Sequence, residues 1–346
     1  MKNTDTMTAW CAVSPGIIKQ VTVKIPEPDD YEVLVKNEGC VFCNNTDKLV
    51  INQHFGSKDF PVLFGHEDFG RVIKIGKKVR KFKLGDRVIC ANAVVNGFDG
   101  TYHSSWGGFA EYGIAGDMEA YLEDHGSIDE NNSYRNRYAA NFVIPSDFSY
   151  EKASLVFPLA EAASAVLQAG EIQGKNIAVI GTGIAGYFFT YFAKIYGAKN
   201  VICLGRRKER LEIAAKLGAD AVFTDINEAE SYLKPFGGAD IAFECSGNPN
   251  VFENGIPYLR CGGTLAVYAV PSKPYEIDFR KMPQSMKFQR VGPKVKDALE
   301  LVCDFLRNDK VPVNLILTHK WNFSEVAKAY EKVISGDVIK GLVEIL

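Results

Sequence analysis

The sequence predicts an α/β protein in which a β-rich region is followed by a doubly wound parallel sheet. Its 346 residues suggest about two domains, at roughly 150 residues for each domain. Residues 1–148 hold short segments rich in valine and isoleucine, separated by turn residues, which is typical of strands. From Ser149 onward, strand and helix patterns alternate along the chain. This alternation favours a parallel sheet with helices on both faces.

The first region is expected to consist mainly of short strands. Strands are predicted at 17–25, 32–37, 62–65, 71–75 and 86–89. A polar stretch at 116–141, rich in Asp, Glu, Asn, Ser and Tyr, then interrupts the pattern. Because a long loop inside a compact domain is usually functional or mobile, we interpret it as an insertion near the mouth of a site. The alternative is a solvated excursion without a functional role.

The second region supplies the strands and helices of the parallel sheet. Helices are predicted at 151–167, 184–196 and 208–217, and strands at 176–180, 201–204, 221–223, 241–243 and 264–270. After Asp278 the chain passes through a basic, less regular stretch. Two further helices are predicted at 293–307 and 323–335, with a last strand at 341–346.

Charge and composition exclude several classes of protein. Forty Lys and Arg residues nearly balance 42 Asp and Glu residues, giving a net charge of −2, whereas nucleic-acid and membrane-surface binders usually carry a basic patch. No apolar run approaches the ~18 residues of a membrane span, and the first residues lack the apolar core of a secretory signal. Eight cysteines are too sparse for a disulfide scaffold. We therefore expect a cytoplasmic protein with reduced thiols that acts on a small molecule and binds neither nucleic acid nor membrane.

Three glycines after an apolar strand form the clearest local motif. Gly181, Gly183 and Gly186 match the pattern GxGxxG where a strand ends and a helix begins, which is the context of a dinucleotide site. Gly181 would allow the tight turn, Gly183 the approach of a pyrophosphate, and Gly186 the packing of helix on strand. The helix start at Ile184 and Ala185 would offer backbone N–H groups to the phosphates. An ordinary glycine turn is the alternative.

The end of the next strand bears on the choice of cofactor. A site for NAD usually has an acidic residue about 20 residues past the motif, which holds the ribose 2′-hydroxyl. This chain has Gly205, Arg206 and Arg207 there. The glycine leaves room, and arginine suits contact with a phosphate, so we favour NADP(H) over NAD(H). The alternative is that both arginines start the next helix on a solvated face.

Two segments of the first region contain possible zinc ligands. Cys43 lies in CVFCNNTD (40–47), and His66 lies in FPVLFGHE (60–67). A thiolate and an imidazole are good zinc ligands, and zinc with an open coordination position polarises an alcohol or a carbonyl. Either residue alone is a weak indication, because a lone cysteine more often belongs to a core.

Together these motifs resemble the medium-chain dehydrogenase/reductase superfamily, in its branch of zinc-dependent alcohol and polyol (sorbitol-like) dehydrogenases. The resemblance rests, in this order, on CVFCNNTD, FPVLFGHE, LGDRV (84–88), GGFAEY (107–112), the glycine motif, AD (239–240), ECSG (244–247) and CGG (261–263). It covers nearly the whole chain except 116–141. It implies a β-rich GroES-like catalytic domain at 1–148 and 290–346, with a Rossmann nicotinamide-binding domain at 149–289 inserted into it.

The resemblance also implies the roles of single residues. Cys43 and His66 would bind a catalytic zinc, with Glu67 as a nearby or alternating ligand. Thr46 matches the hydroxyl that passes on the substrate proton. Asp47 matches the carboxylate that orients the ligand histidine. These residues would form the catalytic site.

The chain departs from the family at the position of the third zinc ligand. The natural alignment places Phe157 there, and phenylalanine cannot bind zinc. Glu161 lies about one helical turn further on and shares that face of the helix, so it could supply the missing carboxylate. It could instead line the nicotinamide pocket or open a solvated helix face. Glu67 could also fill the vacancy directly.

Two further departures concern other cysteine segments. Asn44 and Asn45 stand between Cys43 and Thr46, where one residue is usual in the family. The four clustered cysteines of a structural zinc lobe are absent, since only Cys90 lies in that region, so a second zinc is not expected. The other cysteines are expected in the core, namely Cys11, Cys40, Cys203, Cys245, Cys261 and Cys303.

The sequence thus predicts reversible hydride transfer between NADP(H) and a secondary alcohol or ketone at one catalytic zinc. A polyol, cyclitol or sugar is the preferred substrate, because a carboxylate-containing zinc site without the structural lobe resembles the polyol branch; simple alcohols or aldehydes come second. Two alternatives remain, a zinc-free NADPH-dependent quinone or enone reductase and a nucleotide-binding protein without catalysis. By analogy with relatives we expect a homo-oligomer, a dimer or a tetramer.

Overall fold

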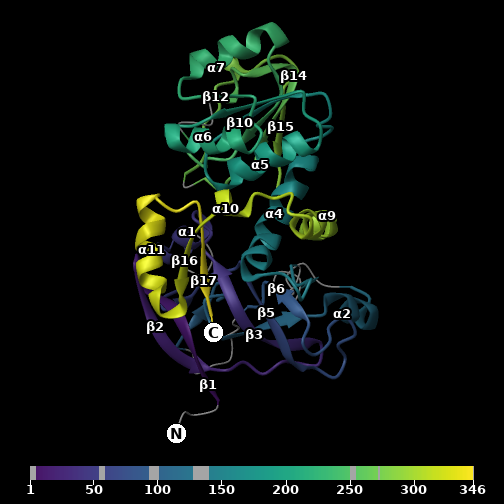
Figure 1. Ribbon diagram of the computed structural model, residues 1–346, viewed down its shortest axis with the longest axis vertical. Helices are drawn as coiled ribbons and strands as arrows, with labels where there is room; N and C mark the ends of the chain where they lie inside the picture. Colours follow the sequence, from purple (N-terminus) through teal and green to yellow (C-terminus); the bar gives the residue numbers. More distant parts are fainter. Residues whose placement is uncertain are drawn as a thin grey trace. The chain divides into compact units, whose positions relative to one another are not determined.

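The chain forms two compact units in the computed structural model. The structure describes residues 5–53, 59–92, 101–127, 140–249, 255–271 and 273–345 (Figure 1). The first unit comprises Met1–Phe157 and Cys303–Leu346, and the second unit comprises Pro158–Val302. The chain passes between the units inside two helices, α4 (Tyr150–Gln168) and α9 (Val295–Arg307). No helix in the described ranges is long and apolar enough to cross a membrane.

The first unit is built on largely antiparallel sheets, as its short apolar segments predict. Its elements are β1 (Thr6–Ser14), β2 (Ile17–Lys24), β3 (Glu32–Val41), α1 (Thr46–Ile51), β4 (Val62–Leu63), β5 (Asp68–Ile75), β6 (Arg87–Ile89), β7 (His103–Ser104), β8 (Tyr112–Gly116), α2 (Met118–His125), β9 (Val143–Ile144), α10 (Val313–Ile316), β16 (Leu317–Asn322), the 3₁₀ turn η4 (Phe323–Glu325), α11 (Val326–Ser335) and β17 (Lys340–Glu344). One sheet has the order β2-β1-β4-β7. The other has the order β16-β17-β3-β5-β6-β9, with β8 also paired to β3. The last strand therefore lies beside the strand that leads to Cys43.

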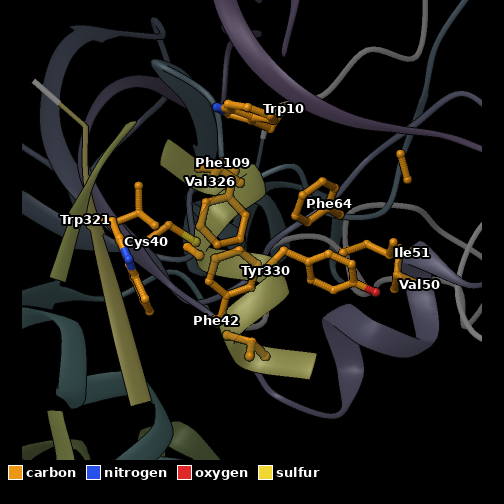
Figure 2. Packing of buried hydrophobic residues seen from close by; sticks show 14 of the residues in the cluster. Trp10, Cys40, Phe42, Val50, Ile51, Phe64, Phe109, Trp321, Val326 and Tyr330 are labelled. Atoms are coloured by element: carbon orange, nitrogen blue, oxygen red, sulfur yellow. The ribbon is translucent and has the colours of Figure 1, made fainter. Parts of the chain in front are cut away.

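Aromatic and aliphatic side chains form a core around the end of β3. Phe42 packs against Phe109 with ring centroids 4.5 Å apart, and α11 adds Val326 and Tyr330 (Figure 2). Cys40 is fully buried in this cluster, as expected for a core cysteine. Burying each large side chain contributes roughly 1.5–3 kcal/mol, so the backbone on the approach to Cys43 is firmly held.

The second unit contains a parallel sheet, as the alternation of strands and helices predicts. Besides the helices it shares with the first unit, its elements are β10 (Asn176–Ile180), α5 (Ile184–Ile195), β11 (Asn200–Leu204), α6 (Lys208–Lys216), β12 (Ala221–Phe223), α7 (Ile226–Leu233), η1 (Lys234–Phe236), β13 (Ala239–Glu244), β14 (Leu259–Val267), η3 (Phe279–Lys281) and β15 (Lys287–Arg290). The order is β12-β11-β10-β13-β14-β15, and every pairing is parallel.

Helices cover both faces of this sheet. On one face, Phe189 of α5 packs edge-on against Phe243 of β13 with centroids 4.9 Å apart. On the other face, Leu233 of α7 packs with Ala178 and Ile202. Side chains alternate between faces along a strand, so the continuous apolar runs of β10 and β11 fit a sheet that is buried on both sides. The doubly wound architecture is confirmed.

The polar stretch expected as a loop at 116–141 begins with a helix, so that expectation is wrong for its first part. Asp117 caps α2 by accepting a hydrogen bond from the Ala120 N–H at 3.0 Å, and Gly126 ends the helix in a left-handed conformation. Tyr121 of α2 packs against Tyr31 with ring centroids 5.3 Å apart. His125, at the end of the helix, packs against the same ring with centroids 5.5 Å apart, so the polar composition concealed a capped helix that docks through aromatic rings. Residues 128–139 lie outside the described part of the chain.

Two other expectations fail in the second unit. The basic stretch after Asp278 contains β15, an exposed edge strand whose lysine and arginine side chains mask its strand pattern. Cys261 is exposed rather than part of the core. It lies where the register of β14 against β13 shifts between Leu259 and Thr264, outside the regular pairing of the two strands. The other cysteines expected in the core are buried.

Candidate active site

Cys43 is placed by the turn that joins β3 to α1. The backbone N–H of Asp47 donates to the Cys43 carbonyl at 3.1 Å, which closes one helical turn just ahead of α1. Residues four apart on a helix share a face, and the inserted residue therefore brings Asp47 back toward Cys43. The side chain of Asn44 donates to the Val338 carbonyl at 3.0 Å and to the Ile339 carbonyl at 3.2 Å. The insertion is thus anchored to the approach of β17.

His66 and Glu67 lie in the short connection between β4 and β5. Gly65, just before them, has a φ of 95°, and a Cβ added there would lie 2.5 Å from the Phe109 ring. Only glycine fits this conformation and this close approach. The packing of Phe109 in the core therefore sets where the histidine and the glutamate emerge.

Cys43, His66 and Glu67 form a cluster that can hold a metal ion. Their possible ligand atoms all lie within 4.8 Å of one another. Sulfur, imidazole nitrogen and carboxylate oxygen are zinc ligands, and a catalytic zinc has three protein ligands and one open position. The structure thus brings together three of the four residues predicted as metal ligands.

Asp47 positions two members of this cluster. Its Oδ1 lies 3.2 Å from His66 Nδ1, and its Oδ2 accepts a hydrogen bond from the Cys43 N–H at 2.9 Å. With Nδ1 engaged by the carboxylate, Nε2 is the histidine atom available to a metal. This is the contact expected of a carboxylate that orients a ligand histidine.

Glu67 is held by a lysine that the sequence analysis did not single out. Lys340, the first residue of β17, is fully buried, and its Nζ forms an ion pair with Glu67 Oε2. Burial lowers the pKa of Lys340, but the charges of Glu67, Cys43 and Asp47 outweigh it, and the net shift is upward. Nothing in the local sequence marks this lysine, because only the pairing of β17 with β3 brings it to the cluster.

The electrostatics of His66 follow the same balance. Burial lowers its pKa, whereas the Asp47 carboxylate and the Cys43 sulfur raise it more strongly, so the pKa lies well above its usual range. These negative groups favour a proton on the imidazole in the metal-free protein. For the same reason they favour a metal cation bound to the imidazole in place of that proton. The donor set therefore suits a divalent metal ion.

Two aromatic rings flank His66. The Trp106 ring centroid lies 5.0 Å from the imidazole, and the Phe157 centroid lies 6.5 Å away in an edge-on arrangement. Phe157, predicted at the position of a third ligand, thus contributes an apolar wall beside the histidine. Trp106 precedes the glycines of the GGFAEY segment and could have been suspected from that position.

The remaining predicted residues of the metal site are not part of this cluster. Thr46 is the first residue of α1 and is half-buried. Glu161 lies on α4 within the second unit. The proton-relay role of Thr46 and the ligand role of Glu161 stay predictions.

Asp68, directly after Glu67, is a buried carboxyl that sequence reasoning missed. Neither side-chain oxygen has a hydrogen-bond partner within the described residues. Burial raises its pKa to about 8. A third acidic or imidazole side chain in the run His66-Glu67-Asp68 was the available signal.

The glycine motif has the geometry of a dinucleotide site. Gly181 has a φ of 111°, and a Cβ on Gly186 would lie 1.8 Å from the Gly181 carbonyl oxygen, so neither position accepts a side chain. No described atom lies within 4 Å of a Cβ added at Gly183, so open space adjoins the start of α5. The first N–H groups of a helix, here at Ile184 and Ala185, lack intrahelical partners and bind phosphates readily.

The end of β11 carries the predicted arginines. Arg206 and Arg207 are exposed, and Arg207 immediately precedes α6. The space that glycine leaves at position 205 is filled by Thr182, whose Oγ1 would lie 2.4 Å from an added Cβ. A third arginine, Arg210, donates to the Thr182 carbonyl at 3.3 Å, so its guanidinium lies beside the glycine motif. Its helical position had masked it in the sequence.

Among the described residues, no second group of three metal-ligating side chains occurs. Cys90, the cysteine in the region of the missing structural lobe, is buried with a φ of 59°. Residues 93–100, which follow it, lie outside the described part of the chain.

Two family models match the chain. The alcohol dehydrogenase GroES-like domain matches residues 29–122, and the zinc-binding dehydrogenase family matches residues 185–291. The first match spans the cluster of Cys43, His66 and Glu67. The second begins inside the glycine motif. Both halves of the predicted site thus fall in matched segments.

Polyol dehydrogenases are among the similar proteins. Sorbitol dehydrogenase of Bacillus subtilis (strain 168) is 28% identical over 264 residues, which are 74% of this chain and 73% of that protein. D-arabinitol dehydrogenase 1 of Uromyces fabae is 26% identical over 349 residues, covering 96% of each chain. A zinc-binding dehydrogenase from Sinorhizobium meliloti 1021, solved with NADP bound, has the same fold, with a TM-score of 0.76 at 22% identity over 98% of this chain and 99% of that one.

Proposed function

Since the chain belongs to the zinc-dependent alcohol and polyol dehydrogenases of the medium-chain dehydrogenase/reductase superfamily, we propose that it transfers a hydride between NADP(H) and a secondary alcohol or the corresponding ketone. Enzymes of this family oxidise CH–OH groups with a nicotinamide cofactor. The substrate oxygen would bind in the first unit and the dinucleotide in the second unit.

The cluster of Cys43, His66 and Glu67 carries this proposal, because its ligand atoms lie within 4.8 Å of one another. A zinc ion held by these residues would supply the positive charge that stabilises negative charge on the substrate oxygen during hydride transfer. Glu67 is the third ligand that we favour, because it lies in the same cluster as Cys43 and His66. Glu161 is the alternative.

The other residues of the site would orient groups and handle the proton. Asp47 keeps His66 in one orientation through the 3.2 Å contact at Nδ1. The Thr46 hydroxyl would pass the substrate proton toward solvent. The rings of Trp106 and Phe157 would keep water from the histidine, and electrostatic interactions are stronger where water is excluded.

The second unit would bind NADP(H). Gly181, Gly183 and the start of α5 would bind the pyrophosphate, supported by the open space at Gly183. Arg206 and Arg207 would bind the 2′-phosphate, because their guanidinium groups suit a phosphate and no carboxylate at the end of β11 holds a 2′-hydroxyl.

A polyol, cyclitol or sugar is the substrate class that we propose. Two relatives named for sorbitol and arabinitol, at 28% and 26% identity, support this choice. A zinc site that contains a carboxylate, in a chain without the cysteines of a structural lobe, also resembles the polyol branch of the family. Simple alcohols form the second candidate class.

Phe157 favours one alternative function. A ring beside His66 in place of a ligand would suit a zinc-free reductase that reduces quinones or enones with NADPH. The presence of Cys43, His66 and the orienting Asp47 weighs against it, because hydride transfer to an enone needs no such donor set.

The deciding experiment is a panel of polyols, cyclitols, simple alcohols and enones, read at the nicotinamide absorbance with NADP(H) and NAD(H) in parallel. We expect turnover of a polyol-type alcohol with NADP⁺. The variant Cys43→Ala should lose turnover yet still bind NADPH. Cys40→Ala, three residues earlier and buried in the core, is the matched control and should retain turnover.

Other outcomes would contradict parts of the proposal. Turnover that survives in Cys43→Ala, with enone as the substrate, would support the zinc-free reductase. NADPH binding without turnover on any compound would support a non-catalytic nucleotide-binding protein. Equal or better turnover with NAD⁺ would refute the role of Arg206 and Arg207.

A further inference from the structure

Glu244 is a buried carboxylate at the carboxyl end of β13. The strand order β12-β11-β10-β13-β14-β15 proceeds outward in opposite directions from β10 and β13. In sheets of this kind, the ligand crevice opens at the carboxyl ends of the two strands where the order reverses. Glu244 has no exposed surface there. Burying a charge in this way is costly unless the charge is paired or hydrogen-bonded.

The loop after β13 and one distant tyrosine supply its hydrogen bonds. Glu244 Oε1 accepts from the Ser246 N–H at 2.7 Å, from the Gly247 N–H at 3.1 Å and from the Ser246 hydroxyl. Oε2 accepts from the Tyr275 hydroxyl at 2.7 Å. Burial and the bond to Glu244 raise the pKa of Tyr275 far above its usual range, so the hydroxyl stays a donor.

This loop packs directly on the glycine motif. The Cys245 N–H donates to the Ile180 carbonyl at 2.9 Å. A Cβ on Gly181 would lie 3.2 Å from both the backbone nitrogen and the Cβ of Ser246. At Gly183, in contrast, no described atom lies within 4 Å of an added Cβ. The loop at 245–247 therefore closes one side of the motif and leaves the other side open.

Glu244 also ties the loop to the end of the next strand. Its backbone carbonyl accepts hydrogen bonds from the Tyr268 N–H at 3.0 Å and from the Ala269 N–H at 3.3 Å. Tyr275 lies a few residues further along the same segment. One residue thus joins the glycine motif, the loop after β13 and the segment after β14.

We propose that Glu244 is a positioning residue for the nicotinamide half of the cofactor. Together with Tyr275, it fixes the loop at 245–247 as a wall of the dinucleotide crevice. This inference presupposes the dinucleotide-dependent function proposed above. A sheet of this type consists of two mononucleotide-binding halves. The glycine motif and the arginines belong to the half formed by β10, β11 and β12. The loop follows β13, the first strand of the other half, and so faces the nicotinamide half.

The test compares Tyr275→Phe with Tyr258→Phe in the full-length, zinc-loaded protein. Tyr258 is a matched control, because its hydroxyl is buried in the same unit without a hydrogen-bond partner within the described residues. Calorimetric titration gives dissociation constants for NADPH and for the adenosine fragment, adenosine 2′,5′-bisphosphate. Tyr275→Phe should weaken NADPH binding about tenfold, as expected for one lost hydrogen bond to a charged group. Affinity for the adenosine fragment should not change, and Tyr258→Phe should change neither.

Glu244→Gln gives a second measurement. The amide nitrogen of glutamine would face donors that need an acceptor, so NADPH binding should weaken about tenfold or more. The KM for NADPH should rise more than kcat falls, and the zinc content should not change. Unchanged NADPH affinity in Tyr275→Phe, or equal weakening of NADPH and the adenosine fragment, would overturn the positioning role. Failure of the wild-type protein to bind either NADPH or NADH would instead refute the proposed function itself.

Discussion

Lys340 is a lysine without exposed surface, and its ammonium group is paired with the carboxylate of Glu67. Such a buried pair adds little net stability, but breaking it by removing one partner leaves an uncompensated charge. Here the remaining charge would be a carboxylate inside a cluster that can hold a metal ion. The metal-free and metal-loaded proteins should therefore respond differently to loss of the lysine.

We predict that Lys340→Met lowers the free energy of unfolding of the metal-free protein by about 3 kcal/mol. With zinc bound, the loss should be smaller, because the cation replaces the ammonium as the partner of Glu67. Urea denaturation with zinc and with a chelator measures both values. Lys340→Arg, which keeps the charge, should show a smaller loss in both states. An equal loss with and without zinc would argue against contact between Glu67 and the metal.

At the scale of elements, α4 is linked to β16 within the first unit by an ion pair between Glu151 and Lys320. The hydrogen bond from Lys320 lowers the pKa of Glu151 to about 2. A carboxyl group whose pKa is depressed in the folded state stabilises the protein above its unfolded pKa, and this stability is lost as the pH falls toward the folded value. The contribution is therefore present at neutral pH and declines below about 4.5.

The expected size of this contribution is about 1 kcal/mol or less, because the Lys320 side chain is 47% exposed and solvent screens the pair. Lys320→Met should thus be less stable than the wild type at pH 6, and the difference should shrink at pH 3. Urea denaturation at the two pH values measures it. Lys328→Met, which removes a more exposed partner of Glu325, serves as the control and should change stability less. A difference that grows at pH 3 would contradict the sign of the linkage.

At the scale of the whole molecule, the described residues hold one cluster suited to a metal ion. We predict that metal analysis of the purified protein finds a single zinc ion per chain and that a chelator removes activity, which added zinc restores. Cys43→Ala should abolish zinc binding. Cys90→Ala should retain it, because Cys90 lies outside the cluster of Cys43, His66 and Glu67. Two zinc ions per chain, or loss of zinc in Cys90→Ala, would show a second site.

The local parts of the fold could be predicted from the sequence. β10 and β12 have the predicted bounds, and the glycine motif lies where a strand meets a helix. These features depend on short-range patterns of apolar residues, glycine turns and helix starts. α2 and β15 were missed, because a capped polar helix and a basic edge strand lack the apolar periodicity on which such predictions depend.

The residues of the candidate site could be predicted from the sequence, but the backbone geometry that places them could not. Cys43, His66 and Glu67 stand out by residue type and motif, and Asp47 by its place in the segment. The effect of the extra residue at Asn44 could not be predicted, because it depends on whether helical winding begins before or after the insertion. In the structure, a hydrogen bond from the Asp47 N–H to the Cys43 carbonyl closes a helical turn across the insertion, ahead of α1.

The class of fold and the candidate residues of the site could be predicted from the sequence, because motifs and periodicity are local properties of the chain. The distant groups that contact each site became visible only in the folded chain. Lys340 meets Glu67 because β17 pairs with β3, and Tyr275 meets Glu244 because the segment after β14 returns to the end of β13. Contacts between residues far apart in sequence depend on strand order and side-chain packing, and a local pattern contains neither.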